Sequence, residues 1–214
     1  MNGEGQGTQT VTRYVDPTPM VVEPVMLEGR FIRLAPMSWT HYDGLCQAGS
    51  DPSIWRYTTS TGETPEKMHA YIETALKWQA EGHALPFTTV DKASEQIAGS
   101  TRFGNIDKNH HRVEIGWTWI HPKWQRTYVN TEAKYLLLRH AFETLGCMRV
   151  ELKTDMLNVR SQKAILRLGA KQEGVFRNHM IINGRVRDSV YFSIIDTEWP
   201  EVKAELEVML ARSY

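Results

Sequence analysis

The chain has 214 residues, of which 41% are hydrophobic and 23% charged, a composition that suits one globular domain with a substantial core. Its 25 basic and 25 acidic residues cancel, so no overall field attracts it to nucleic acid or to an anionic membrane, and any anion site must be local. Cys46 and Cys147 lie far apart without metal-ligand spacing, so a disulfide framework or a zinc knuckle is unsupported, and no apolar run of about eighteen residues exists to span a bilayer. We expect a cytoplasmic protein that binds no metal.

The first 24 residues are rich in Gly, Gln, Thr and Pro and lack apolar periodicity, so they cannot form a core alone. We predict that residues 1–24 form a tail that is flexible or lies along the domain, and that residues 25–214 form one domain.

The N-terminal half of that domain alternates short β patterns with helical ones. Thr64-Pro65-Glu66 combines a capping residue, a proline at the first helical position and an early carboxylate, and predicts an amphipathic helix that ends near Gly82. The other patterns predict a strand at 31–34, a helix at 39–48, and a meander of strands at 86–90, 96–101 and 113–120.

The C-terminal half begins with the clearest helical periodicity in the chain, which spans 128–144 and is closed by Gly146. Asn183-Gly184 is a strong hairpin signal between two β patterns. The remaining patterns predict a strand at 149–154, a helix from Asn158 to Gly169, hairpin strands at 176–182 and 186–195, and a terminal helix at 197–212.

The junction between the strand that ends at Ile120 and the helix that starts near Tyr128 is a candidate anion site. The first N–H groups of a helix have no intrahelical acceptor, and the helix dipole adds roughly half a positive charge there. A diphosphate fits such a terminus without a basic patch. Lys123 and Arg126 in the connecting loop would add positive charge.

Two ordered blocks carry a family resemblance. Gln125-Arg126-Thr127-Tyr128-Val129-Asn130 resembles the Gln/Arg-x-x-Gly-x-Gly/Ala phosphate loop of the GNAT acyltransferases, with Tyr128 and Asn130 in place of the two glycines. The surrounding stretch from Trp124 to Lys134 is similar to the variant found in the RimJ/RimL-type branch, whose members acetylate ribosomal-protein N-termini. The second block, Asn158 to Ala164 followed by Leu168-Gly169-Ala170, resembles the segment after the next strand in that branch.

The resemblance runs from about residue 27 to residue 199 and implies an α+β (mixed α/β) GNAT fold. Its central, mostly antiparallel mixed sheet would have about seven strands, be splayed in the middle and be flanked by helices. Acetyl-CoA is the implied co-substrate. The positions that match the family's donor-binding segments are Trp119, Ile120, Gln125, Arg126, Thr127, Tyr128, Val129, Asn130, Thr131, Asn158 and Ser161.

Glu114 is the candidate general base, because an attacking amine must lose a proton and a nearby carboxylate can take it, directly or through water. Strand alternation places Val113, Ile115, Trp117 and Trp119 on one face and Glu114 on the other, less apolar face. Glu114 lies eleven residues before Gln125, which is similar to the base position in the histone-acetylating members of the family. The alternative is a structural carboxylate paired with Arg112 or with a neighbouring strand.

A backbone N–H near Trp119 or Ile120 would stabilise the oxyanion, as the resemblance implies. Ser161 matches the position that assists the leaving thiolate in RimL-type enzymes; alternatively its hydroxyl satisfies the first turn of a helix. Asn158 either caps that helix or binds the pantetheine arm. We favour the second role for Asn158.

Three further residues are weaker candidates. Tyr128, beside the expected phosphates, is either a hydrogen-bond donor or a residue that covers the loop, and Tyr191 on the last strand is an alternative acid. Cys147 sits between a helix and a strand with no base beside it in sequence, which favours burial over an acyl-enzyme role, so we predict direct transfer.

The leading hypothesis is an N-acetyltransferase that transfers an acetyl group directly from acetyl-CoA to a primary amine, either a protein N-terminus or a small molecule. The alternative is a non-catalytic acyl-CoA-binding or regulatory domain, suggested by the two replaced loop glycines. A nucleotide binder of Rossmann or P-loop type is disfavoured because neither glycine motif is present. The oligomeric state stays open, with a homodimer among the alternatives.

Overall fold

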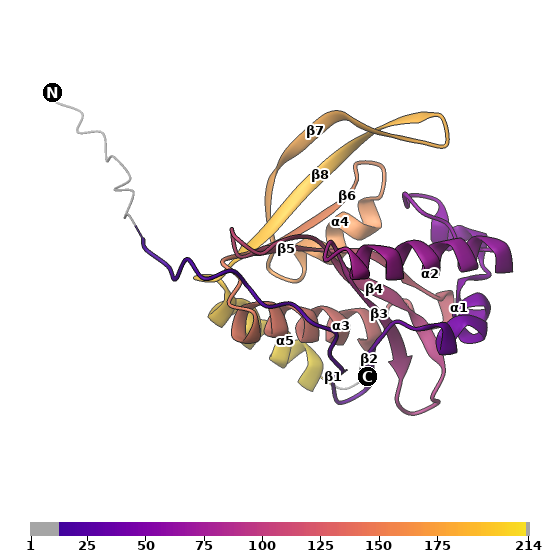
Figure 1. Cartoon of the computed structure of the whole chain (residues 1–214), viewed down its shortest axis with the longest axis horizontal. Helices are drawn as coiled ribbons and strands as arrows, with labels where there is room; N and C mark the ends of the chain where they lie inside the picture. The colour runs from indigo at the N-terminus through magenta and orange to yellow at the C-terminus, as the bar shows by residue number, and fades with distance from the viewer. Residues whose placement is uncertain (1–12, 213–214) are drawn as a thin grey trace, which may run out of the picture.

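The computed structural model describes residues 13–212, which build an eight-stranded sheet of order β1-β2-β3-β4-β5-β6-β8-β7 (Figure 1). The strands are β1 (Leu27–Glu28), β2 (Ile32–Pro36), β3 (Leu85–Asp91), β4 (Ile97–Asp107), β5 (Arg112–Ile120), β6 (Arg149–Asp155), β7 (Lys171–Ile182) and β8 (Arg185–Ile195). The helices are α1 (Tyr42–Gly49), α2 (Pro65–Ala80), α3 (Tyr128–Arg139), α4 (Val159–Leu166) and α5 (Trp199–Ala211). This is the mixed α/β fold that the sequence predicts, with the short β1 as an additional strand.

The sheet opens in its middle, between β5 and β6. These two strands form the only parallel pair in the sheet of the described chain, and they pair only from Arg112 with Arg149 to Glu114 with Glu151. All the other neighbouring strands are antiparallel. Beyond this short pairing β5 continues to Ile120 and β6 to Asp155, so the carboxyl-terminal part of each strand has an edge that the other does not cover.

Helices cover both faces of the sheet and create two hydrophobic cores. On one face α3 and α5 pack against the sheet, and their core includes Phe103, Leu137 and Trp199. On the other face α1 and α2 build a smaller, aromatic-rich core around Trp119. The β7–β8 hairpin extends beyond the other strands (Figure 1).

The helix that carries the predicted anion site begins where its sequence indicates. Thr127 Oγ1 accepts the Val129 N–H at 3.3 Å, and such an N-cap is worth about 1 kcal/mol. The predicted helix 128–144 is α-helical only to Arg139 and ends in a π-helical turn over His140–Thr144. That turn widens because the Leu145 N–H bonds to the carbonyl five residues earlier, before Gly146 reverses the chain with a φ of +67°.

A buried carboxylate fixes α3 to the start of the sheet. Glu132 is only 3% exposed and accepts the backbone N–H groups of Arg30, Phe31 and Ile32 at 2.7 to 2.8 Å. Three charge-assisted hydrogen bonds satisfy both carboxylate oxygens. They lock the β1–β2 turn onto the helix that follows β5.

Residues 13–24 of the predicted tail lie along the domain, whereas residues 1–12 fall outside the described part. Met20 is buried in the larger core, and its N–H donates to the Lys108 carbonyl at 3.1 Å. Figure 1 shows this segment passing over the domain. Within residues 13–212, no helix is both long and apolar enough to cross a membrane.

Candidate active site

A cavity of about 530 Å³ occupies the opening between β5 and β6. Its wall is built by the carboxyl-terminal half of β5, the loop and first turns of α3, β6, α4 and the 54–60 segment. Nine of the predicted site residues line it: Glu114, Trp119, Ile120, Gln125, Arg126, Thr127, Asn130, Asn158 and Ser161. Residues more than forty positions apart in sequence thus meet at one cavity.

One end of the cavity is cationic and contains the N-terminus of α3. Arg126, Arg160 and Arg167 all line the cavity. Arg126 has a φ of +63°, which turns the chain sharply before the helix starts. A helix N-terminus surrounded by guanidinium groups is a favourable environment for a diphosphate.

Gln125 braces this loop. Its Nε2 donates to the Ile120 carbonyl at 2.9 Å, and its Oε1 accepts from Arg160 at 2.7 Å. The side chain therefore links the end of β5, the loop before α3 and α4. Because both ends of the Gln125 amide are engaged by these hydrogen bonds, the backbone of the loop is left to contact a ligand.

The side chains of three other predicted residues are used elsewhere and do not line the cavity. The Tyr128 hydroxyl donates to Asp91 Oδ1 at 2.6 Å, and burial raises the pKa of this tyrosine to about 12. Val129 is fully buried in the core, and Thr131 accepts from Arg167 at 2.8 Å. At these positions only the backbone remains for donor binding.

A β-bulge in β5 overturns the predicted alternation of its side chains. Trp117 has a φ of +48°, and the register with β4 shifts so that Trp117 and Thr118 lie opposite one residue. Val113 and Ile115 enter the core on the α3 face, but Trp119 enters the core on the α2 face. The expectation that all the odd-numbered residues point one way is wrong, because the extra residue inverts the order beyond Gly116.

The bulged strand directs backbone groups into the opening. The His121 N–H donates to the Ala98 carbonyl of β4 at 2.9 Å. Because backbone groups alternate along a strand, those of Ile120 point to the opposite edge, where its carbonyl accepts from Gln125. Of the two predicted oxyanion donors, Ile120 therefore offers its N–H to the cavity side, and Trp119 directs its own toward β4.

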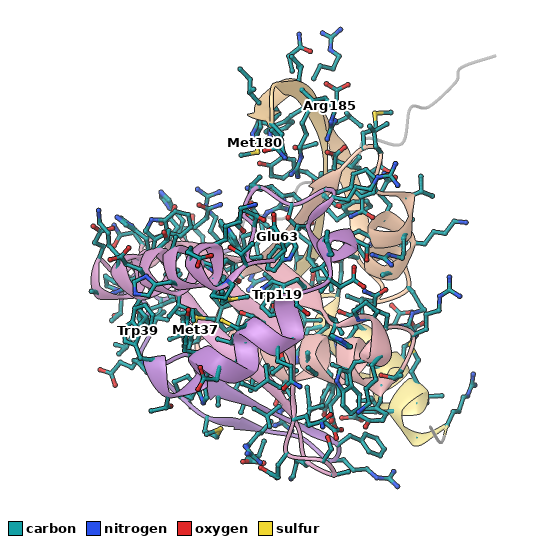
Figure 2. The ribbon with its side chains drawn as sticks, turned by 90° about the vertical axis from the view of Figure 1, so that its right-hand side faces the viewer. Met37, Trp39, Glu63, Trp119, Met180 and Arg185 are labelled. Carbon is teal, nitrogen blue, oxygen red and sulfur yellow. The ribbon has the colours of Figure 1, made fainter. Side chains whose placement is uncertain are left out.

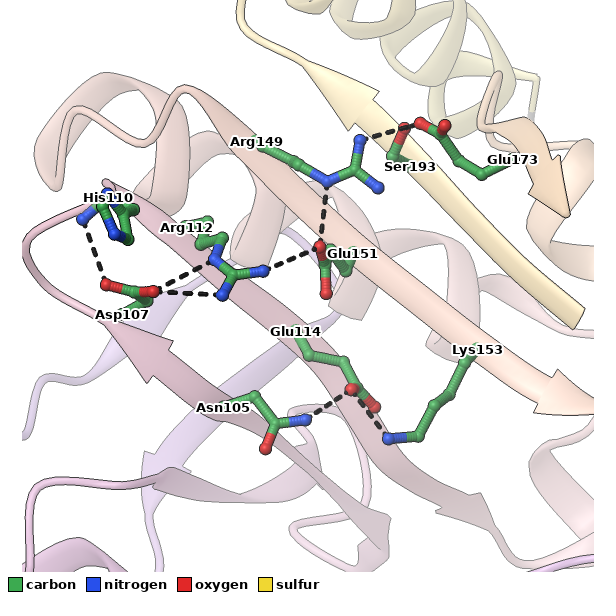
Figure 3. Close-up of polar contacts among 10 residues, drawn as sticks. All are labelled: Asn105, Asp107, His110, Arg112, Glu114, Arg149, Glu151, Lys153, Glu173 and Ser193. Carbon is green, nitrogen blue, oxygen red and sulfur yellow. Dashed lines mark hydrogen bonds and ion pairs between the residues drawn. The ribbon is translucent and has the colours of Figure 1, made fainter. Parts of the chain in front are cut away.

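Glu114 is 3% exposed and is held from two directions (Figure 3). Its Oε2 accepts from Asn105 Nδ2 at 2.7 Å and from Lys153 Nζ at 3.0 Å. Arg112, which sequence analysis considered as a partner, instead contacts Asp107 and Glu151. Glu114 is thus paired with the neighbouring strand β6 and still lines the cavity.

Asn158 and Ser161 lie at the start of α4. Asn158 Oδ1 accepts the Ser161 N–H at 3.1 Å, so its oxygen acts as the helix cap that sequence analysis kept as the alternative. Its amide group and the Ser161 hydroxyl have no hydrogen-bond partner within residues 13–212, and both residues line the cavity. Tyr191 does not line it and instead packs against the ring of Phe176 in a tilted arrangement.

The other end of the cavity is aromatic and opens beside the β7–β8 hairpin. Trp119 packs against Trp55 and Tyr71 with ring centroids 5.1 and 6.2 Å apart. Residues 57–60 and the hairpin residues Met180 and Arg187 also line the cavity. Figure 2 shows Met180 on the hairpin, on the far side of Glu63 from Trp119.

Comparison with known proteins identifies the family. An acetyltransferase (GNAT) domain model matches residues 32–171. The chain belongs to the GNAT acetyltransferase family. It is 28% identical over 169 residues to an uncharacterized N-acetyltransferase, p20, of Bacillus licheniformis, covering 78% of this chain and 94% of that one.

A functionally named GNAT relative is the ribosomal protein uS5-alanine N-acetyltransferase of Escherichia coli strain K12, 26% identical over 136 residues, or 63% of this chain and 70% of that enzyme. A GCN5-related N-acetyltransferase of Brucella melitensis superposes with a TM-score of 0.85 at 33% identity, over 91% of this chain and 90% of that one. The splayed mixed sheet and the resemblance to the ribosomal-protein-acetylating branch of the GNAT family are confirmed. The chain is an N-acetyltransferase of the GNAT class.

Sequence reasoning missed two residues of this GNAT site. Lys153 is the ion-pair partner of Glu114. Lys134, on α3, donates to Thr118 Oγ1 at 2.7 Å from the face of the sheet that α3 covers. Lys134 precedes the buried residues Leu137 and Leu138 by three and four positions. The helical period therefore places it on the inward face, which was the available signal. No local pattern predicts the contact of Lys153 with Glu114.

Proposed function

We propose that this GNAT protein binds acetyl-CoA in the opening between β5 and β6 and transfers the acetyl group directly to a primary amine. The observation that carries the proposal is the continuous cavity that joins the N-terminus of α3 to Glu114. Its cationic end suits the diphosphate, and the cavity extends along the uncovered edge of β5. This arrangement supports a donor that enters between the two strands.

The residues of the chain divide the chemistry between them. Glu114, directly or through a water molecule, takes the proton that the acceptor amine loses on attack. The Ile120 N–H stabilises the negative charge that develops on the acyl oxygen. The Ser161 hydroxyl donates a hydrogen bond to the departing sulfur.

Cys147 takes no part in the proposed reaction. It is 2% exposed, lies in the larger core, and burial raises the pKa of its thiol to about 12. A thiol that holds its proton so firmly is a poor nucleophile near neutral pH. Its environment supports direct transfer without an acyl-enzyme.

We further propose a protein N-terminus as the acceptor. The relative from Escherichia coli acts on ribosomal protein uS5. In this chain the cavity is lined by residues 57–60 and by Met180 and Arg187 of the projecting hairpin, and we propose that a polypeptide acceptor lies against these segments. A free N-terminal α-amino group also has a pKa of about 8, so a useful fraction is neutral and nucleophilic near pH 7.

The test is release of free thiol from acetyl-CoA with three acceptor sets: peptides with free N-termini, the same peptides with blocked N-termini, and small amines. The proposal expects turnover only with free N-terminal peptides, and a loss of about 100-fold in Glu114→Gln with unchanged CoA affinity. Turnover of small amines alone would contradict the acceptor assignment. CoA binding with no turnover of any acceptor would favour the non-catalytic domain instead.

A further inference from the structure

Lys134 is a buried amine with most of its hydrogen-bonding capacity unused. It is 5% exposed, and its Nζ makes one hydrogen bond, to Thr118 Oγ1. It forms no ion pair with any carboxylate of residues 13–212. An ammonium group carries three N–H donors, so two remain for a ligand, and Lys134 lines the cavity.

A buried lysine without an ion-pair partner lowers the stability of the folded protein, so its position calls for a functional explanation. Burying an ammonium without a paired carboxylate is strongly unfavourable. Burial lowers the pKa of Lys134 to about 7. The negative charge of Glu114 opposes this shift but does not cancel it. Apart from Glu114, the other charged side chains that line the cavity are all cationic: Arg126, Lys153, Arg160, Arg167 and Arg187. Cations therefore outnumber carboxylates in the cavity wall, which favours a ligand group that carries negative charge.

Lys134 and Glu114 approach the opening from opposite faces of β5. Thr118, which receives the Lys134 hydrogen bond, also bonds to Thr101 on the α3 face, directly after the bulge at Trp117. Glu114 lies on the opposite face of the strand from Val113 and Ile115, which pack into the α3-side core. A donor arm in the opening would therefore have the Lys134 ammonium on the α3 face of the sheet and the Glu114 carboxylate on the opposite face.

We propose that Lys134 is a catalytic acid that protonates the leaving sulfur of the acyl donor. This inference rests on the proposed function. As the new C–N bond forms and the C–S bond breaks, the electron pair of that bond passes to sulfur. The Lys134 ammonium gives one proton to the thiolate, and the amine's own proton goes to Glu114. The neutral Lys134 regains a proton from water after the thiol leaves.

Proton affinities agree with this direction of transfer. A free thiol has a pKa of about 8.5, so a proton moves downhill to the thiolate from an acid whose pKa is about 7. A serine hydroxyl is a far weaker acid. Ser161 can orient the sulfur with a hydrogen bond, but Lys134 supplies the proton.

The first test needs no acceptor. CoA and desulfo-CoA, which lacks the sulfur, are titrated into the wild type and into Lys134→Met, whose side chain has similar length but no N–H. We expect the wild type to bind CoA about tenfold more tightly than desulfo-CoA, because the sulfur gains a charge-assisted hydrogen bond, and this preference to vanish in Lys134→Met. Equal preference in both proteins overturns the inference alone. Absence of CoA binding to the wild type overturns both it and the proposed function.

The second test separates proton donation from simple charge. Lys134→Met should lower kcat by about 100-fold, and Lys134→Arg should not restore it, because an arginine keeps its positive charge but does not release its proton near neutral pH. The wild-type kcat should fall as the pH rises through about 7, a limb that both variants lose. Recovery of kcat in Lys134→Arg, or a change confined to the KM for acetyl-CoA, contradicts the inference. Lys108→Met, at an exposed turn remote from the cavity, is the matched control and should behave as wild type.

Discussion

The ammonium of Lys153 lies 3.0 Å from Glu114 Oε2 and bridges β5 and β6 just where their pairing ends. The last paired residues are Glu114 and Glu151, and Lys153 stands two positions further along β6. The ion pair therefore joins the two strands at the inner end of the opening. It also fixes the orientation of the carboxylate that we propose as the base.

Removal of Lys153 should destabilise the protein more than removal of both charges. Lys153→Met leaves the Glu114 carboxylate buried with Asn105 as its one remaining partner, and breaking a buried pair from one side costs about 3 kcal/mol. The double variant Glu114→Gln/Lys153→Met should recover part of that loss. Chemical denaturation of Lys153→Met, Glu114→Gln and the double variant measures this coupling. Additive losses would show that the pair contributes nothing to folding.

Gly116→Ala should displace the Glu114 carboxylate without unfolding the domain. A Cβ at residue 116 would lie 2.8 Å from Glu114 Oε1, so the carboxylate must move while Lys153 and Asn105 hold its other oxygen. We expect kcat to fall about tenfold, because small displacements of a catalytic group are costly. Gly174→Ala is the control, since a Cβ there meets nothing within 4 Å. Unchanged kcat in Gly116→Ala would argue against Glu114 as the base.

Glu132 should be among the most sensitive positions for stability. Glu132→Ala leaves three backbone N–H groups without an acceptor, and each unsatisfied buried group costs about 1 to 3 kcal/mol. We expect a loss of at least about 3 kcal/mol, with a smaller loss in Glu132→Gln, which keeps one oxygen. Glu73→Ala, on the exposed surface of α2, should change the free energy of unfolding by less than about 0.5 kcal/mol. Equal losses at the two positions would contradict this role.

Lys134 should also make stability depend on pH. The unfolded lysine keeps its proton up to a pKa near 10.5, whereas the folded one loses it near 7. Between these values the unfolded state binds more protons, so the free energy of unfolding rises with pH. Lys134→Met should therefore be more stable than wild type near pH 7, by a margin that shrinks as the pH approaches about 10. A margin that stays constant with pH would show that Lys134 does not titrate in this range.

The sequence predicted the elements well because their signals are local. The Thr64-Pro65-Glu66 start, the Asn183-Gly184 turn and the Gly146 stop each depend on residues close together in the chain, and the structure places helix or hairpin boundaries at each. The candidate anion site was predicted by the same reasoning, because a loop that leads from a strand into a helix exposes the N-terminus of that helix, and it stays a prediction.

The detailed arrangement of the site was less accessible from sequence. The bulge at Trp117 depends on the pairing of β5 with β4, so a simple two-residue alternation placed Trp119 on the wrong face. The contacts of Glu114 with Lys153 and of Lys134 with Thr118 join elements whose packing no short motif encodes. From the sequence we favoured Asn158 as a residue that binds the pantetheine arm of the acyl donor, whereas in the structure its side-chain oxygen caps α4.

A crystal structure of the protein with CoA bound would locate the donor. We predict the diphosphate at the backbone of residues 125–131, with the arm between β5 and β6 and the sulfur within hydrogen-bond distance of Lys134 Nζ. A diphosphate bound away from this helix terminus, or an arm outside the opening, would contradict it.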